Sequence, residues 1–212
     1  AGGDLNVGGN WTRTGGGTPG TFVHNNRSVA FNGTATQTIT VTGGGTEAFA
    51  YMTINKTAAT SLTLAGSPNA TNVNLNGGNA GGNTLIFTNG DIDLNQNTFT
   101  FSSYNGGQNN IQVDGTTGNF NRNINSTGGQ GIFAIVNTDA VNTGTVVIAR
   151  FSAAAARRAQ LVCASNVKFT VGGTTRPSGV NFGTNTTFYI TNMNGIFEIE
   201  SNGFVSTNPC NF

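Results

Sequence analysis

The sequence predicts an all-β protein, and two observations support this prediction. Apolar and polar residues alternate in short runs, which is the period of a strand with one buried face. Gly, Asn and Thr, with 32, 32 and 33 copies, supply tight turns and polar outward positions between and along these runs. Fifteen Phe and regular Val, Ile and Leu alternation distinguish the chain from a disordered, weakly charged one.

The alternation is densest in residues 84–102, TLIFTNGDIDLNQNTFTFS. Apolar residues take every second position within three short runs, and Asp91, Asp93, Asn95 and Asn97 take alternating sites. An apolar face this narrow is unstable alone, so the segment needs similar segments stacked above and below it. The chain provides them as apolar triplets that begin at Val29, Ile39, Met52, Leu62, Val73, Leu85, Ile92, Phe99 and Ile111.

Two all-β architectures fit these triplets. A β-sandwich would use hairpins at its Asn-Gly pairs, which are Asn32-Gly33, Asn76-Gly77, Asn89-Gly90 and Asn105-Gly106. A right-handed parallel β-solenoid would stack very short strands, with Asn and Gly in left-handed conformations at its corners. We favour the solenoid because the strands are so short and because Thr and Asn can align from one coil to the next.

The pattern changes near residue 119, which divides the chain into two predicted parts. Residues 1–118 form the β-solenoid, opening with Leu5, Val7 and Trp11 facing one core. Residues 119–212 form a smaller β module, predicted to be antiparallel, or the last coils of the solenoid with a cap that protects its open edge. Residues 145–151 are a longer strand, residues 152–160, SAAAARRAQ, have helix propensity, and three further alternating segments follow.

Charge and cysteine content narrow the classes of partner. Only 8% of residues are charged and the formal net charge is +1, which predicts no nucleic-acid partner. No apolar run approaches the length of a spanning helix, so we expect no membrane insertion. The opening AGGDLNVGG lacks the features of a signal peptide, so we expect a processed chain or an excised piece.

Cys163 and Cys210 are predicted to form a disulfide in an extracellular setting, with two buried free thiols as the alternative.

Several segments resemble the repetitive parts of large secreted surface proteins of Bacteroidota, which are adhesin-like or gliding-associated. The similar segments are GDLNVGGNW at 3–11, SVAFNGTATQTITV at 28–41, AYMTINKT at 50–57, LIFTNGDIDLNQNTFTF at 85–101 and GNFNRNINSTGG at 118–129. The resemblance implies a β-helical stalk or adhesive module at the cell surface, without catalytic residues.

A search for catalytic and metal-binding patterns favours a non-enzymatic protein. Glycoside hydrolysis needs two carboxylates across a sugar, and Asp91 with Asp93 or Glu198 with Glu200 supplies two neighbouring acids. The apolar residue between each two acids points inward, so the acids are expected to face water. A calcium loop beginning at Asp91 fails where Gln96 replaces the required Gly. We predict no catalytic residues, no cofactor and no metal site.

The predicted function is a structural or adhesive module that forms part of an extracellular stalk or filament. Self-association or contact with neighbouring modules would use Leu5, Val7, Trp11, Phe204 and Phe212. The alternative is a carbohydrate-binding module that stacks glycans on Tyr51, Tyr104 and Tyr189. A glycan-degrading β-helix enzyme and an ice-binding protein, the latter using the row Thr36, Thr38, Thr40 and Thr42, are less favoured.

Overall fold

The computed structural model of the protein describes fourteen segments of the chain. They are residues 4–14, 22–43, 45–57, 60–67, 70–75, 82–103, 108–113, 120–137, 145–150, 159–163, 167–172, 179–182, 186–190 and 197–199. Every regular element within them is a β-strand, which confirms the all-β prediction. None of these segments contains a helix of the length and apolarity needed to span a membrane.

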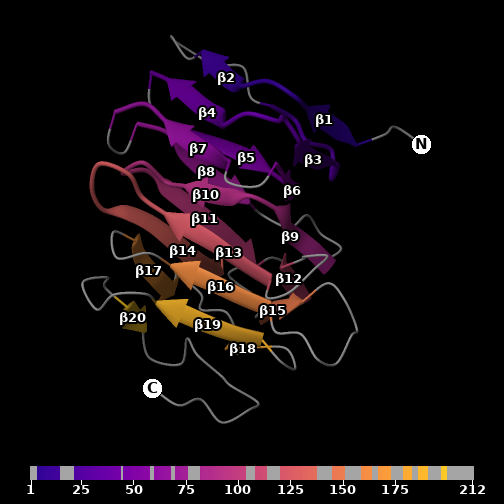
Figure 1. The fold of residues 1–212 in the computed structure, drawn as a ribbon, viewed down its shortest axis with the longest axis vertical. Coiled ribbons are helices and arrows are strands. Elements are labelled where there is room, and N and C mark those ends of the chain that lie inside the picture. Colours follow the sequence, from indigo (N-terminus) through magenta and orange to yellow (C-terminus); the bar gives the residue numbers. More distant parts are fainter. Residues whose placement is uncertain are drawn as a thin grey trace.

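The strands form three sheets, which we name A, B and C (Figure 1). Sheet A contains β1 (Leu5–Val7), β3 (Ser28–Phe31), β6 (Tyr51–Asn55), β9 (Gly82–Asn89), β12 (Gln108–Val113), β15 (Thr145–Arg150) and β18 (Gly179–Phe182). Sheet B contains β2 (Trp11–Thr14), β4 (Gln37–Thr42), β7 (Ser61–Ala65), β10 (Asp91–Asp93), β13 (Phe120–Asn125), β16 (Ala159–Cys163) and β19 (Thr186–Ile190). Sheet C contains β5 (Thr46–Phe49), β8 (Asn72–Leu75), β11 (Thr98–Ser103), β14 (Gly131–Asn137), β17 (Val167–Gly172) and β20 (Phe197–Ile199).

Every pairing between these strands is parallel, and the chain visits the three sheets in turn. From β3 onward, each strand pairs with the strand three elements later, so β3 pairs with β6 and β4 with β7. Figure 1 shows the strands stacked from β1 and β2 at one end to β18, β19 and β20 at the other. A parallel pair cannot be joined by a tight hairpin, and from β3 onward each return to the same sheet runs through one strand of each of the other two.

Alternation along each strand sets which side chains enter the core. In β4, Ile39 and Val41 are buried, whereas the alternating residues Thr38 and Thr40 are partly exposed. The same alternation places Ile92 inside between Asp91 and Asp93 in β10. The inward residues of all three sheets contribute to one hydrophobic cluster, which includes Leu62, Phe87 and Phe101. Burial of these apolar faces is the main stabilising contribution that the strands share.

Parallel register aligns like residues in the core of sheet C. Phe99 pairs with Val73 on one side and Phe133 on the other, and the rings of Phe99 and Phe133 stack with centroids 5.5 Å apart. The backbone register continues from Phe133 to Phe169 and then to Phe197. Four successive strands therefore carry Phe at the same register position, a repetition that the sequence spacing alone does not reveal.

The two Asn-Gly pairs within the described residues do not form the hairpins that a β-sandwich requires. Asn32-Gly33 lies between β3 and β4, and Asn89-Gly90 lies between β9 and β10, so each joins strands of different sheets. Gly90 has φ of +86°, and the turn after β10 places Asn95 and Gln96 at φ of 43° and 64°. Left-handed residues therefore turn the chain from one sheet to the next, as predicted for these types. Asn76-Gly77 and Asn105-Gly106 lie outside the described residues.

Strands on both sides of residue 119 belong to the same three sheets. β13 pairs with β10 before it and with β16 after it, and both pairings are parallel. The described strands after residue 119 are therefore not antiparallel, which corrects that part of the expectation for residues 119–212. The domain boundary itself stays a prediction. The segment with helix propensity lies outside the described residues up to its last two, which begin β16.

Candidate functional site: buried polar contacts between strands

The described core contains a small set of buried polar side chains, and these are the candidates for chemistry. They are Gln37, Glu47, Lys56, Thr71, Thr84, Asn97 and Ser126. Gln37 and Lys56 lie where the chain passes from sheet A to sheet B, and Thr71, Asn97 and Ser126 lie where it passes from sheet B to sheet C. Glu47 lies on β5, the first strand of sheet C. Buried polar groups need partners, and the partners define what each group does.

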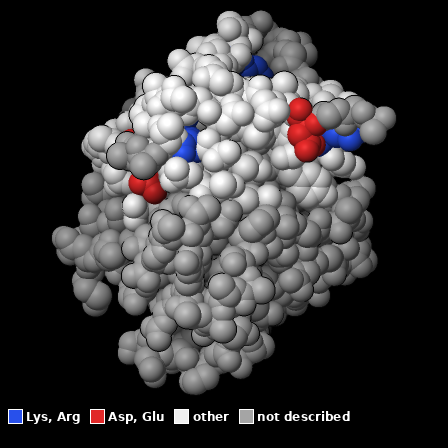
Figure 2. Space-filling view, turned by 45° about the vertical axis from the view of Figure 1, so that its right-hand side comes forward, with Lys and Arg blue, Asp and Glu red and all other residues white. Residues whose placement is uncertain are grey.

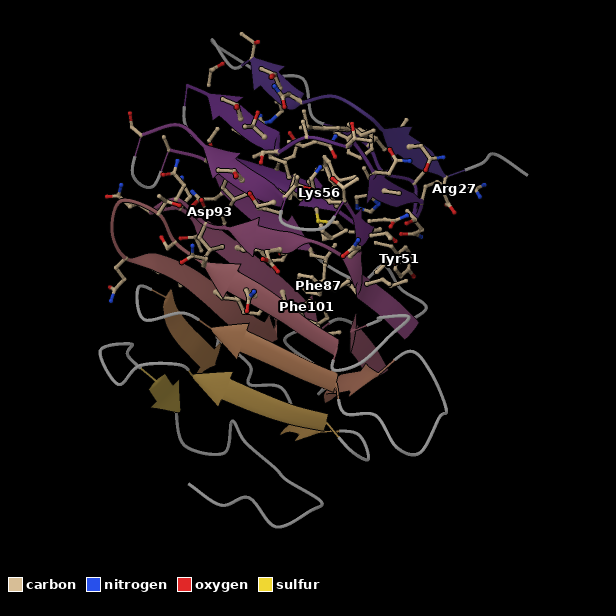
Figure 3. The ribbon with its side chains drawn as sticks, in the orientation of Figure 1. Arg27, Tyr51, Lys56, Phe87, Asp93 and Phe101 are labelled. Atoms are coloured by element: carbon tan, nitrogen blue, oxygen red, sulfur yellow. The ribbon has the colours of Figure 1, made fainter. Side chains whose placement is uncertain are left out.

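Lys56 directly follows β6 and extends into the interior, as Figure 3 shows. Its Nζ donates to the carbonyl oxygen of Gly33 at 3.0 Å and to Oε1 of Gln37 at 2.7 Å. Lys56 is only 2% exposed, and its burial lowers the pKa of the amine because the charged form loses hydration. The amine thus connects the segment after β6 to the segment after β3. We call each such segment, which joins a strand of one sheet to the next strand in another sheet, a passage.

Gln37 continues this connection toward the N-terminal end of the stack. Its Oε1 also accepts from the backbone N–H of Gly33 at 2.8 Å. Its Nε2 donates to the carbonyl oxygens of Val7, at 2.8 Å, and Gly9. Lys56 and Gln37 therefore join three successive passages from sheet A to sheet B. We call these two residues and Gly33 the Lys56 cluster.

Because Gly90 has no side chain, the aliphatic part of the Lys56 side chain fits beside the passage that contains Gly90. A Cβ at Gly90 would lie 2.7 Å from Cβ of Lys56 and 2.9 Å from the carbonyl oxygen of Thr60. Such contacts would force the backbone or the buried lysine to move, in addition to the strain of φ at +86°. Glycine at this position therefore allows the passages to approach each other closely.

A second set of polar contacts joins the passages from sheet B to sheet C. Asn97 accepts from the N–H of Thr71 at 3.0 Å and donates to the carbonyl oxygen of Leu64 at 3.1 Å. Thr71 in turn accepts from the N–H of Val41 at 3.1 Å through its Oγ1. Ser126 accepts from the N–H of Gln96 at 2.9 Å. Each of these bonds gives a backbone N–H or carbonyl group a side-chain partner.

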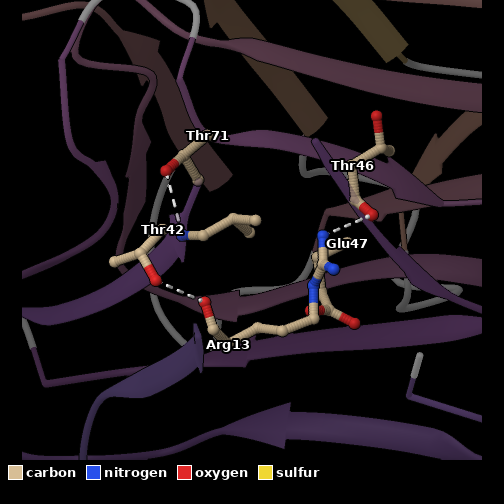
Figure 4. Close-up of polar contacts among 6 residues, drawn as sticks. Arg13, Thr42, Thr46, Glu47 and Thr71 are labelled. Carbon is tan, nitrogen blue, oxygen red and sulfur yellow. Dashed lines mark hydrogen bonds and ion pairs between the residues drawn. The ribbon is translucent and has the colours of Figure 1, made fainter. Parts of the chain in front are cut away.

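A buried ion pair lies at the N-terminal end of the stack. Nε of Arg13, on β2, lies 2.8 Å from Oε2 of Glu47, on β5. Nη2 of Arg13 also donates to the carbonyl oxygen of Thr46 at 3.2 Å, as Figure 4 shows. The two side chains are 12% and 2% exposed, so both charges lose most of their hydration and depend on each other. Charged residues at the end of a sheet reduce its tendency to pair with another strand.

Asp91 and Asp93 are bonded to the next strand of sheet B rather than directed together at a substrate site. Asp91 accepts from the N–H of Asn123 at 2.9 Å and from its Nδ2 at 3.2 Å. Asp93 accepts from the N–H of Thr127 at 2.9 Å and from its Oγ1. Both acids are half-buried on the outer face of β10, and the labelled Asp93 lies at the margin of the stack in Figure 3. Their oxygens are thus used to connect β10 to the segment that follows it in the sheet.

The predicted glycan-stacking residues are only partly placed. Tyr51 is half-buried at the start of β6, on the outer face, in register with Ser28. Tyr189 lies in β19, where the structure describes the strand but not the side chain. Tyr104 lies outside the described residues. The three tyrosines are therefore not shown to form one binding surface.

Three of the predicted subunit contacts, Leu5, Val7 and Trp11, lie in the first two strands. Leu5 is 42% exposed, whereas Val7 and Trp11 are half-buried against the core cluster. The Trp11 ring packs edge-on against Phe22, with centroids 4.9 Å apart, and Phe49, at 5.3 Å. Phe204 and Phe212 lie outside the described residues.

The predicted disulfide stays a prediction. Cys163 is the last residue of β16, where its backbone pairs with Ile124 and Ile190. Cys210 lies outside the described residues.

In the described part of the chain, no three His, Cys, Asp or Glu side chains are grouped in a way that could hold a metal ion. His24 accepts from the N–H of Asn26 through Nδ1 at 3.1 Å.

The surface carries few charges, in agreement with the composition. Figure 2 shows acidic and basic side chains in small, separate groups on the described part of the visible face, which is otherwise uncharged.

The polar residues that the sequence pattern did not reveal are the buried ones, above all Lys56, Gln37 and Asn97. Gln37 had a detectable signal, because it stands at an apolar position of the alternating segment QTITVT.

Comparison of the chain with protein-family models, curated proteins and solved structures finds no match in any of the three.

Proposed function

We propose that the protein is a right-handed parallel β-solenoid in which each coil contributes one strand to each of the three sheets. The support is the regular succession of sheets A, B and C along the chain, with parallel pairing throughout the described strands. Crossover connections between parallel strands of one sheet are almost always right-handed.

The proposed function is that of a non-enzymatic structural or adhesive module at the cell exterior. One observation carries this proposal: the buried polar side chains with described contacts, and the two acids of β10, bond to neighbouring strands and passages. Apart from short-range bonds such as the one between Gly33 and Gln37 within one passage, these bonds join residues between 19 and 34 positions apart, so they connect neighbouring coils. Side chains used in this way hold the stack together, which is the requirement for a stalk or filament. The resemblance to secreted Bacteroidota surface proteins favours the same role.

The proposed partners are further copies of the chain or neighbouring modules of a surface assembly. At the N-terminal end of the stack, Leu5 is exposed and Val7, Trp11 and Phe22 are partly exposed, so this end offers apolar area for a contact. Burial of apolar area is the usual driving force of such association. Arg13 and Glu47 lie beside this area and would restrict strand-to-strand pairing, so we expect side-chain packing rather than an extended sheet.

Negative-stain microscopy combined with light scattering, with and without reductant, tests the assembly. We expect ordered fibres from the unmodified protein, and discrete particles from Trp11→Asp because a carboxylate would be placed in the apolar contact. Thr100→Asp, on the outer face of β11, is the matched control and should assemble normally. Normal fibres from Trp11→Asp would contradict the contact, and dispersion by reductant would support a disulfide that includes Cys163.

A carbohydrate-binding module is the second candidate. The observation that favours it is the position of Tyr51 on the outer face of β6, where an aromatic ring is available as a stacking platform. Binding on a glycan array by protein that forms no fibres would favour this function over assembly.

A further inference from the structure

The Lys56 cluster contains an unusual nucleophile. Among the described residues, Lys56 is the buried cation that has neutral oxygens rather than a carboxylate as its recorded partners. A neutral amine has two N–H donors for these two oxygens and keeps one lone pair. The lowered pKa of Lys56 increases the fraction of this neutral form. A lysine desolvated in this way is activated as a nucleophile.

The side chain of Gln37 is held as an electrophile beside this amine. Its Oε1 accepts from the Gly33 N–H at 2.8 Å, and a backbone N–H at this position stabilises negative charge that develops on the oxygen. Its Nε2 is held by the carbonyl oxygens of Val7 and Gly9. Gln37 is 2% exposed, so little water competes for either group.

The distance between the reacting atoms is short. Nζ of Lys56 lies 2.7 Å from Oε1 of Gln37. Since a carbonyl bond is about 1.2 Å long, Nζ lies within about 4 Å of Cδ. Reacting atoms in productive complexes are about 3–3.5 Å apart, so a small rotation of the lysine side chain brings the lone pair to the carbon. A reaction between these two groups has to occur only once in each molecule, so a slow reaction is sufficient.

We propose that Lys56 and Gln37 form an intramolecular isopeptide bond. The lone pair of Nζ attacks Cδ, and Oε1 carries the negative charge of the tetrahedral intermediate. The Cδ–Nε2 bond then breaks, a proton from Nζ passes to Nε2, and ammonia leaves. The product is a secondary amide between Nζ and Cδ, formed without an oxidant or a further reactant.

The bond would join two successive passages from sheet A to sheet B. Gln37 opens β4 and Lys56 follows β6, so the cross-link connects neighbouring coils at the N-terminal end of the stack. Such a link would keep these coils together under tension. The inference goes beyond the proposed structural function, since the contact geometry would permit the bond whatever the protein binds.

Mass spectrometry of the intact, full-length folded protein tests the proposal. We expect the purified chain, after incubation at mildly alkaline pH, to be lighter than its sequence mass by one ammonia. Trypsin should fail to cleave after Lys56, and tandem spectra of the resulting peptide, residues 28–122, should place the loss of ammonia in a cross-link between Lys56 and Gln37. Localisation is essential because succinimide formation at an Asn-Gly pair also releases ammonia.

Two variants serve as controls. Lys56→Arg keeps a cation and its donors but has no nucleophilic amine, and Gln37→Met keeps the length of the side chain without a carboxamide. Both should have their sequence mass. A wild-type chain that stays at its sequence mass would overturn the proposal, as would a loss of ammonia that persists in Lys56→Arg. The internally cross-linked peptide is sought in the wild-type protein, so the test stands even if a variant does not fold.

Discussion

At the scale of single residues, the buried polar groups distinguish this core from a purely apolar stack. Asn97 illustrates the point, because its amide accepts from the N–H of Thr71, before β8, and donates to the carbonyl oxygen of Leu64, in β7. A buried N–H or carbonyl without a partner costs more than the hydrogen bond itself contributes. The few polar side chains in the core are therefore expected to have effects on stability out of proportion to their number.

Replacement of Asn97 by Ala tests this expectation. The Thr71 N–H would lose its acceptor, and the free energy of unfolding should fall by about 1–3 kcal/mol. Urea denaturation followed by circular dichroism measures the change. Asn55→Ala, at an exposed position of β6, is the matched control and should shift the value by no more than about 0.5 kcal/mol. Equal effects from the two variants would show that the Asn97 bonds contribute nothing specific.

At the scale of elements, the first strands of sheets B and C are joined by charge. Arg13 and Glu47 both stand at register positions that face the core, where Arg13 pairs with Val41 and Glu47 with Val73. Replacing a buried ion pair by apolar residues is often neutral or stabilising, so stability alone does not explain these charges. Their place beside the end of the stack is consistent with protection of the sheet edges from unwanted pairing.

A double-mutant cycle tests the ion pair. Arg13→Met leaves the carboxylate of Glu47 buried without a partner and should lower the free energy of unfolding by about 3 kcal/mol or more. Glu47→Leu should cost less, because Arg13 is more exposed and can turn toward water. The double variant should recover most of the loss, with raised aggregation as the expected cost of losing the edge charges. Additive losses would mean that the two charges do not interact.

At the scale of the whole molecule, apolar burial and neutral hydrogen bonds dominate over charge. The chain has 8% charged residues and a formal net charge of +1, and the described part contains a single recorded salt bridge. Salt weakens interactions between exposed charges and leaves apolar burial largely intact. The stability of the molecule should therefore depend little on ionic strength.

Thermal unfolding at about 0.1 M and about 1 M NaCl checks this expectation, since exposed charges are largely screened over that range. The midpoint should move by only a few degrees, and Arg13→Met should respond to salt no more strongly than the unmodified protein. A large fall of the midpoint in high salt would instead assign much of the stability to ion pairs.

The sequence by itself determined the local structure of this protein. The period of two identified the strands and placed residues such as Ile92 and Phe101 in the core, because alternation fixes which face a side chain occupies. Asn and Gly marked the turns, since these residues adopt left-handed conformations at low cost. The low charge and the outward acids of β10 were also evident from the pattern.

Only the tertiary structure decided which strands pair and which polar groups meet inside. Alternation is the same for parallel and antiparallel neighbours, so it left the sandwich open and allowed an antiparallel module after residue 119, where the described strands instead pair in parallel. The contacts of Lys56 with Gln37 and of Arg13 with Glu47 join residues on different coils. No local pattern encodes such contacts, because they depend on the register in which distant strands are stacked.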